Sequence, residues 1–319
     1  MTMRELAKLA NVSVSTISKA FADADDVGEE TKARIFALAK QYGCFGKYQK
    51  NKFSKKVFAI VCPELISDYY VAFVEQLREI IEENGGIAVI SVDHFNHKKQ
   101  AELIEYYASY LHVDGIVVFG LHSQIKKGYD IPIVAMFSAI DTNVDSVKVC
   151  MENAMLEAVD LLYRKGHRTL TFVGEPRTVE KRRLFFLACQ RYPDVTPRSC
   201  TVEKRFEAAG EEAVRALLKE PTLPHALVCG YDYIAIGAIK ALKEAGISVP
   251  ADISVIGADN IGISEYAEVP LTTIDSESLE VCSAVWELLA KKQKNKFWRA
   301  NRDITIKARL VERSSVGER

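Results

Sequence analysis

Apolar and polar positions divide the chain into a short helical segment and a long segment in which strands and helices alternate. In the first 42 residues, apolar positions recur three and four residues apart, which is the spacing of amphipathic helices. Thr2 followed by Glu5 is a capping-box pattern, and Ser13 can cap a second helix. The pattern therefore predicts three helices, over residues 3–10, within 12–21 and over 29–42.

The second predicted helix has one apolar face and one short, polar face. Its inward positions are Val12, Ile17, Ala20 and Phe21, and its outward positions are Val14, Ser15, Ser18 and Lys19. Asn11 stands in the preceding turn, where a left-handed backbone is expected. Short outward side chains let a helix backbone approach a partner closely, and its first amides can meet phosphates. A DNA-reading bundle and a three-helix protein-interaction module both fit this pattern.

From residue 57 onward, short β-branched runs alternate with amphipathic helices. Strands are predicted over residues 57–62, 87–92, 115–119, 133–137, 170–173, 226–229 and 254–256. Helices are predicted over residues 70–84, 98–111, 152–165, 181–190, 208–218 and 234–245. Continuous apolar strands between helices indicate parallel sheets that are buried on both faces. We expect two doubly wound α/β lobes with a ligand cleft at the carboxyl ends of their strands.

Charge differs between the two ends of this 319-residue chain. Residues 1–57 carry 11 Lys and Arg against 6 Asp and Glu, and the remainder carries 31 against 37. A basic segment on an acidic body suggests a polyanion partner for one end only. Between residues 43 and 57 the chain reads as a basic linker, with lysines at 47, 50, 52, 55 and 56.

Cysteine usage and hydropathy indicate the compartment. The seven cysteines are odd in number and scattered, without a C-x-x-C pair, which fits reduced thiols in the cytosol. There is no apolar run of signal-peptide length, nor one of the ~18 residues that a membrane span needs. We therefore expect a cytoplasmic protein without a membrane partner.

The first helices carry a family resemblance. The run L-A-K-L-A-N-V-S-V-S-T-I-S-K-A-F, followed by V-G-E-E-T-K-A-R-I, resembles the helix-turn-helix headpiece of LacI/GalR-family transcription regulators. The resemblance implies that Val14, Ser15 and Thr16 read bases in operator DNA, supported by Ser18 and Lys19. Asn11 stands where the family usually has Gly, and Gly28 where it usually has Ser.

The linker departs from the family. There the corresponding segment folds into a hinge helix on DNA and wedges an apolar residue, commonly Leu, into the minor groove. That place falls near Asn51 or Lys52, so the usual wedge is missing. Phe53 could substitute, or Lys47, Lys50 and Lys52 could only attract phosphates. A solvated linker is the third interpretation.

The long segment carries the same resemblance. Its landmarks are V-D-G-I-V-V at 113–118, R-K-G-H-R at 164–168, A-I-G-A-I-K-A-L at 235–242, I-S-V-P-A-D-I-S-V-I-G-A-D-N at 247–260 and P-L-T-T-I at 270–274. They are similar to the family's regulatory domain, a periplasmic-binding-protein type I fold. This implies a headpiece over 1–42, a hinge or linker over 43–57 and an effector-binding, dimerising domain over 58–319. One lobe would comprise 58–149 and 278–305, the other 150–275 and 306–319, with crossings near 149–151, 275–278 and 305–306.

The resemblance also implies effector contacts. Arg182 and Asp259 match the family's effector-contacting arginine and aspartate, and such a pair suits the hydroxyls of a small neutral molecule. The two could instead pair with each other. Tyr231, Phe137, Tyr69 and Phe206 would make the site aromatic, and Phe185 replaces a usual Gly. Aromatic walls suit sugar faces and flat nucleobases equally. Each of these aromatic residues is more often core than ligand contact.

The resulting expectation is a repressor that binds pseudo-palindromic operator DNA as a homodimer and responds to a small effector, a sugar or sugar derivative. We expect no enzymatic activity and no cofactor, because no phosphate loop or nucleophile motif occurs. Asp93, His94 and His97 lack the spacing of a metal site. An exported binding protein and an enzyme acting in the cleft are the alternatives.

Overall fold

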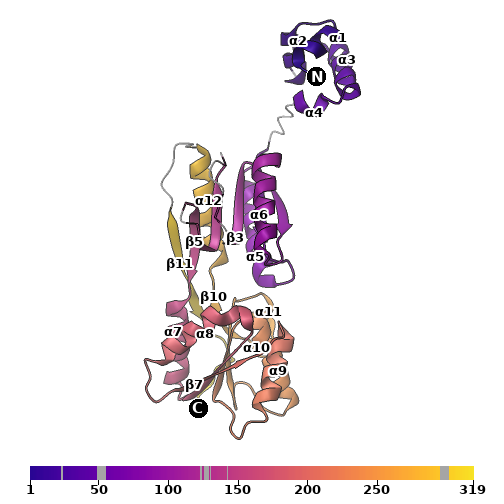
Figure 1. Ribbon diagram of the computed structural model, residues 1–319. Coiled ribbons are helices and arrows are strands. Elements are labelled where there is room, and N and C mark those ends of the chain that lie inside the picture. Colours follow the sequence, from indigo (N-terminus) through magenta and orange to yellow (C-terminus); the bar gives the residue numbers. More distant parts are fainter. Residues whose placement is uncertain are drawn as a thin grey trace. The chain divides into compact units, whose positions relative to one another are not determined.

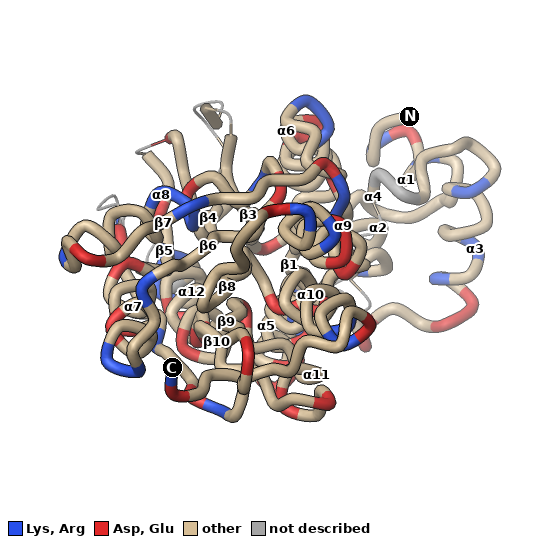
Figure 2. Tube along the Cα trace, turned by 90° about the horizontal axis from the view of Figure 1, so that it is seen from below, with Lys and Arg blue, Asp and Glu red and all other residues tan. Residues whose placement is uncertain are grey.

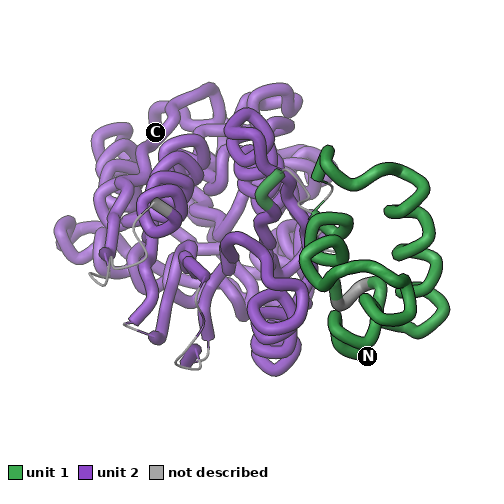
Figure 3. Tube along the Cα trace, turned by 90° about the horizontal axis from the view of Figure 1, so that it is seen from above, with its two compact units in different colours: residues 1–56 green, residues 57–319 purple. Residues whose placement is uncertain are grey.

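The computed structural model describes residues 1–22, 24–48, 55–122, 124–125, 129, 131–141, 143–294 and 302–319. Two compact units make up the chain, residues 1–56 and residues 57–319 (Figure 3). In the described part of the chain, no helix is long and apolar enough to cross a membrane.

The first unit contains the three predicted helices: α1 (Met3–Leu9), α2 (Val14–Phe21) and α3 (Glu29–Gln41). Thr2 and Glu5 form the predicted capping box, with reciprocal hydrogen bonds of 2.7 and 3.3 Å. The Ser13 hydroxyl accepts from the Thr16 amide at 2.9 Å, and Asn11 has the expected left-handed φ of 49°. Leu6, Ile17 and Ile35 are fully buried between the helices. The helix and cap predictions are confirmed.

A fourth helix, α4 (Phe45–Tyr48), lies within the stretch predicted to be linker. Tyr48 is buried, and its hydroxyl donates to the Met1 carbonyl at 2.7 Å. The rings of Phe45 and Tyr48 pack 5.8 and 5.9 Å from that of Phe21. Aromatic burial thus extends the headpiece core beyond residue 42, because these rings complete a small core that three helices leave open.

The second unit contains two six-stranded sheets, one in each lobe (Figure 1). The first sheet has the order β11-β5-β4-β3-β1-β2 and is parallel throughout. Its strands are β1 (Val57–Cys62), β2 (Ile87–Val92), β3 (Gly115–Leu121), β4 (Ile133–Ala139), β5 (Asp145–Cys150) and β11 (Asp303–Lys307). Phe58 and Ile60 face the core under α5 (Asp68–Glu83) and α12 (Ser278–Lys294). Ala59 and Val61 face α6 (His97–Glu105) and the π-helix η1 (Tyr106–Leu111).

The second sheet has the order β12-β10-β9-β8-β6-β7, with β12 antiparallel to β10. Its strands are β6 (Thr169–Gly174), β7 (Thr196–Thr201), β8 (Ala226–Cys229), β9 (Ser254–Ala258), β10 (Thr272–Asp275) and β12 (Arg309–Val311). One face packs on α7 (Glu152–Arg164) and α8 (Val179–Cys189), the other on α9 (Glu207–Leu217) and α10 (Asp232–Glu244). The short helices η2 (Pro176–Thr178) and α11 (Ile263–Tyr266) border the sheet. In Figure 2, the central strands β8 and β9 carry no Lys, Arg, Asp or Glu, and the charged residues lie around them.

The chain crosses between the lobes three times: between β5 and α7, between β10 and α12, and at Ala308 between β11 and β12. The third crossing falls two residues beyond the 305–306 implied by the resemblance. The fold class is confirmed, since a helical headpiece precedes two doubly wound, mainly parallel lobes.

Candidate functional site

The outward face of α2 presents small side chains. Val14 is 41% exposed, Ser15, Ser18 and Lys19 are exposed, and Thr16 is half-buried. A shallow hollow of about 730 Å³ lies beside the start of this helix and is lined by Arg4, Ala7, Lys8, Asn11, Val12, Ser13 and Val14. Because a first helical turn leaves amides without helix partners, this end of α2 suits contact with a phosphate backbone.

The structure describes only some of the basic residues that were predicted to bind DNA. Lys19 forms an ion pair with Asp26, and the partnership lowers the pKa of that carboxyl. Lys47 lies in α4, but its side chain is outside the described residues, as are Lys50, Lys52 and Phe53 entirely. Sequence patterns gave no signal for Asp26.

A cavity of about 280 Å³ lies between the two lobes of the second unit. Glu64, Phe95 and Phe137 reach it from the carboxyl ends of β1, β2 and β4. Tyr231 and Asp259 reach it from the ends of β8 and β9. The remaining lining residues are Ser67, Tyr69, Tyr70, Val149, Met151, Glu175, Arg177, Thr178, Lys181, Arg205 and Phe206. This is the location at which open α/β sheets bind ligands.

Aromatic rings form much of the wall, and the structure brings together four predicted aromatic residues. Tyr69 stacks on Phe137 with ring centroids 5.7 Å apart. The Tyr231 hydroxyl accepts from the Phe206 amide at 3.0 Å. Phe137 and Phe206 have φ of 68° and 57°, which bulky residues seldom adopt. Backbone strain of this kind gathers at functional sites, where surrounding packing maintains it.

Asp259 lies in the cavity wall, but its partner is Lys181 at 2.7 Å rather than Arg182. Arg182 is not among the lining residues, and its guanidinium donates to the Thr201 hydroxyl at 3.4 Å. Neighbouring positions on a helix point about 100° apart, so α8 turns only Lys181 toward Asp259. Burial raises the pKa of Asp259, and Lys181 partly offsets that rise.

A second ion pair crosses the cavity from lobe to lobe. Both terminal nitrogens of Arg205 donate to the Glu64 carboxylate, at 2.9 and 2.7 Å. The hydrogen bond to Glu64 raises the pKa of Arg205. Arg177 lies 4.4 Å from the Phe95 ring centroid and 4.0 Å from the buried Glu175 carboxylate. Sequence reasoning missed these residues, because Glu64 and Arg205 are 141 positions apart and belong to no motif.

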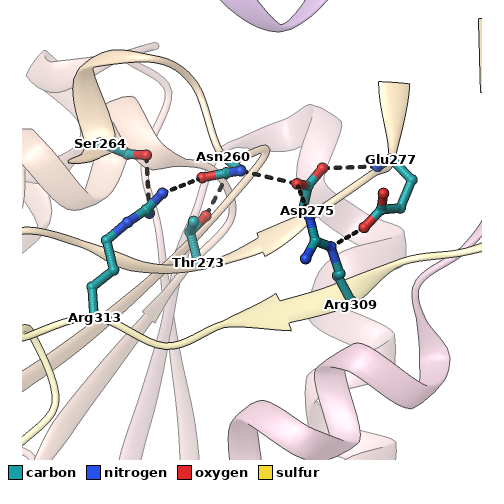
Figure 4. A network of polar contacts seen from close by, with 7 residues as sticks. All are labelled: Asn260, Ser264, Thr273, Asp275, Glu277, Arg309 and Arg313. Carbon is teal, nitrogen blue, oxygen red and sulfur yellow. Dashed lines mark hydrogen bonds and ion pairs between the residues drawn. The ribbon is translucent and has the colours of Figure 1, made fainter. Parts of the chain in front are cut away.

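A polar network links two of the crossings between the lobes to Asn260, the residue that follows Asp259 of the cavity wall (Figure 4). Asn260, next to Asp259, donates to Asp275 at 2.9 Å and accepts from Arg313 at 2.8 Å. Arg309 pairs with Glu277 and lies 3.5 Å from Asp275. The segments at Asp275–Glu277 and Arg309 are therefore tied to each other and, through Asn260, to the cavity.

The group considered for metal binding is arranged differently. Asp93 is buried and accepts from the Phe95 amide and the Gln100 side chain at 2.8 and 2.9 Å. His97 stacks on His122 with ring centroids 4.4 Å apart. Among the described residues, no cluster of three or more His, Cys, Asp or Glu side chains could hold a metal ion.

Comparison with known proteins gives these sites a context. Residues 2–44 match the family of bacterial regulatory proteins, lacI family, and residues 159–316 match the periplasmic binding protein-like domain. The chain is 27% identical to the HTH-type transcriptional repressor CytR of Escherichia coli (strain K12), over 88% of this chain and 86% of that protein.

Two solved structures share the fold. One is a LacI family transcriptional regulator from Enterococcus faecium with bound ribose, with a TM-score of 0.72 and 19% identity, covering 82% of this chain and 99% of that one. The other is the lac repressor dimer bound to operator and the anti-inducer ONPF, with a TM-score of 0.72 and 19% identity over 99% of both chains. The chain therefore belongs to the LacI family and is an effector-controlled DNA-binding repressor.

Proposed function

We propose that this repressor binds a small, neutral, hydroxyl-bearing molecule, a sugar or sugar derivative, in the cavity between its lobes. The observation that carries the proposal is the composition of the cavity wall, which contains both aromatic rings and ion-paired polar groups. Aromatic faces such as those of Tyr69 and Phe206 suit the apolar faces of a sugar ring. Carboxylates and cations such as Asp259 and Lys181 suit its hydroxyls. The fold relative with bound ribose supports this chemistry.

The headpiece supplies operator recognition. In this proposal Val14, Ser15 and Thr16 read base edges, while Ser18 and Lys19 hold the helix against the backbone. Lys47, Lys50 and Lys52 add phosphate attraction, and Phe53 is the candidate minor-groove wedge. Small side chains make few strong base contacts, so dimer geometry and phosphate contacts contribute much of the affinity.

The active species in this proposal is a cytoplasmic homodimer on a pseudo-palindromic operator. One headpiece of this size covers too little DNA for high specificity, and two related by a two-fold axis match two half-sites. The lac repressor fold relative was solved as a dimer bound to operator. No catalysis is invoked, since binding alone provides the switch.

Control follows from two conformations of the lobes. The effector shifts their balance only if it binds one conformation more tightly than the other. Asp259 contacts the effector, and its neighbour Asn260 holds the crossing at Asp275. We infer that a change at Asp259 reaches the crossings through this network and then the part of the linker that follows Tyr48.

Operator selection followed by effector titration tests the proposal. Operator sequences are first selected from random duplex DNA with the full-length protein. Fluorescence anisotropy then measures operator affinity in the presence of individual neutral sugars. We expect one sugar class to change the affinity, and Asp259→Asn to abolish the change while the fold is kept. If Asp259→Asn responds to that sugar as the wild type does, the effector does not bind in this cavity.

A further inference from the structure

The ion pair between Glu64 and Arg205 is held in a fixed geometry at the cavity. The Glu64 side chain is 8% exposed and that of Arg205 28% exposed. Glu64 follows β1 in one lobe, and Arg205 precedes α9 in the other. Two parallel hydrogen bonds between a guanidinium and a carboxylate fix both the distance and the plane of the pair.

Aromatic rings keep the Arg205 guanidinium in place. Its central carbon lies 4.5 Å from the Phe206 ring centroid and 5.7 Å from that of Phe95. Stacking on aromatic faces is favourable for a guanidinium, and more so where water is excluded. Arg205 is therefore held on two sides by rings and on a third by Glu64, which limits how far it can turn toward a ligand.

The charged residues of the cavity wall balance one another. Three are acidic, Glu64, Glu175 and Asp259, and three are basic, Arg177, Lys181 and Arg205. Each cation has an acidic partner in the same wall, at 2.7 Å for Lys181, 2.7 Å for Arg205 and 4.0 Å for Arg177. The wall thus has no formal net charge and offers no surplus cation to an anionic ligand.

We propose that the Glu64–Arg205 pair makes the cavity selective for uncharged ligands and excludes phosphorylated ones, so that Glu64 is a specificity-determining residue. This inference rests on the function proposed above and deepens it. A phosphate placed beside Arg205 would also meet the Glu64 carboxylate. Taking Arg205 away from Glu64 would leave a buried carboxylate without its partner, which is strongly unfavourable. Specificity arises here from a repulsive group as well as from attractive ones.

Replacing Glu64 by glutamine should reverse this preference. The glutamine side chain would keep most of the shape and accept one hydrogen bond, but Arg205 would become a cation without a counter-charge. Inorganic phosphate then serves as the probe. Thermal unfolding of the full chain is measured in sodium phosphate and in sodium chloride of equal ionic strength, for the wild type, Glu64→Gln and Glu203→Gln. Glu203 is an exposed carboxylate two residues before Arg205, so its variant loses the same charge without breaking the pair.

Phosphate stabilises folded proteins in general, so all three proteins should gain in Tm relative to chloride. We expect the gain of Glu64→Gln to exceed that of the wild type and of Glu203→Gln by about 2–4 °C. A wild type stabilised as much as Glu64→Gln would overturn the proposal, as would a Glu64→Gln protein that folds and gains nothing. Wild-type protein alone gives a second measurement, with D-ribose against D-ribose 5-phosphate and D-glucose against D-glucose 6-phosphate. Greater stabilisation by either phosphate ester than by its parent sugar would also overturn it.

These experiments measure ligand binding through the shift in Tm, and they do not depend on release of operator DNA. A ligand that binds with the expected charge preference but leaves operator affinity unchanged would contradict the proposed function and keep the selectivity. A phosphorylated ligand that binds in the cavity and releases operator would overturn the selectivity and the neutral charge of the proposed effector, and would keep only the control of operator binding by an effector.

Discussion

The Lys181 ammonium lies 2.7 Å from the Asp259 carboxylate in the cavity wall, while Arg182, the next residue of α8, points to Thr201. The Asp259 side chain is 10% exposed and that of Lys181 is 20% exposed. Breaking such a pair removes a charge-assisted hydrogen bond from the wall and leaves a buried carboxylate unpaired.

Lys181→Met is therefore expected to weaken effector binding by about 10–100-fold, the loss of one hydrogen bond to a charged group. Arg182→Met should change it by less than about threefold, because the Arg182 contact at 3.4 Å lies outside the cavity wall. Isothermal titration with the sugar that changes operator affinity measures both, with circular dichroism to confirm the fold. A larger loss of effector affinity in Arg182→Met than in Lys181→Met would show that Arg182 contacts the effector, as the family motif implies.

The buried carboxyl of Asp232 should make stability depend on pH. Burial raises its pKa from 3.8 to about 8, and Asp259 adds to the rise. The folded protein thus keeps this proton up to about pH 8, while the unfolded chain loses it near 3.8. Between these values the folded state binds one more proton, so stability falls as pH rises, by up to about 1.4 kcal/mol per unit.

Asp232→Asn should remove that slope. The asparagine can accept from the Ile261 amide and donate to the Thr273 hydroxyl, which replaces the present contacts of 2.9 and 2.5 Å. Urea unfolding of both proteins between about pH 5 and 7.5 measures the difference, since groups remote from Asp232 titrate alike in the two. Parallel curves would show that Asp232 is ionised throughout this range.

Asp26 should restrain the binding of DNA by Lys19. Asp26→Asn removes a negative charge beside a lysine on the outward face of α2 and frees that lysine for a phosphate. Affinity for any duplex should rise, and the slope of log K against log salt should steepen by about 0.9. Lys19→Met should weaken binding and make the slope shallower. Anisotropy titrations from about 50 to 300 mM salt measure both, and an unchanged slope in Asp26→Asn would show that Lys19 makes no phosphate contact.

Phe53 and the linker lysines should affect DNA in different ways. If Phe53 is the wedge, Phe53→Ala lowers the affinity for the selected operator by tenfold or more, roughly the cost of one lost unstacking contact. The affinity for random duplex DNA should stay unchanged. Lys50→Ala and Lys52→Ala should lower the affinity for both DNAs by the same factor. The wedge is absent if Phe53→Ala binds the operator with wild-type affinity.

Arg309 should couple the effector cavity to the crossings. Arg309→Met removes the ties to Asp275 and Glu277 but no residue of the cavity wall. Effector affinity should stay within about threefold, while the effector-induced change in operator affinity falls by half or more, within the usual range of coupling energies. Lys307→Met, an exposed lysine on the other side of Ala308, is the matched control. Equal responses in both variants would place the coupling elsewhere.

Local pattern was enough for much of the fold. The caps at Thr2 and Ser13 and the strands β1, β2 and β8 follow the prediction, because short-range spacing and apolar runs determine them. The polar edge strand β7 (Thr196–Thr201) was not predicted, because an edge strand needs no apolar run. The helix predicted over 98–111 instead becomes the π-helix η1 from Tyr106.

The sequence by itself determined the headpiece, the α/β lobes and a cleft that contains Asp259 and several aromatic residues. Only the tertiary structure decided which charged groups face that cleft. The phase of α8 selects Lys181 over Arg182, and the meeting of two lobes brings Glu64 to Arg205 across 141 positions. Such choices depend on helix rotation and on contacts between distant segments, which no local spacing records.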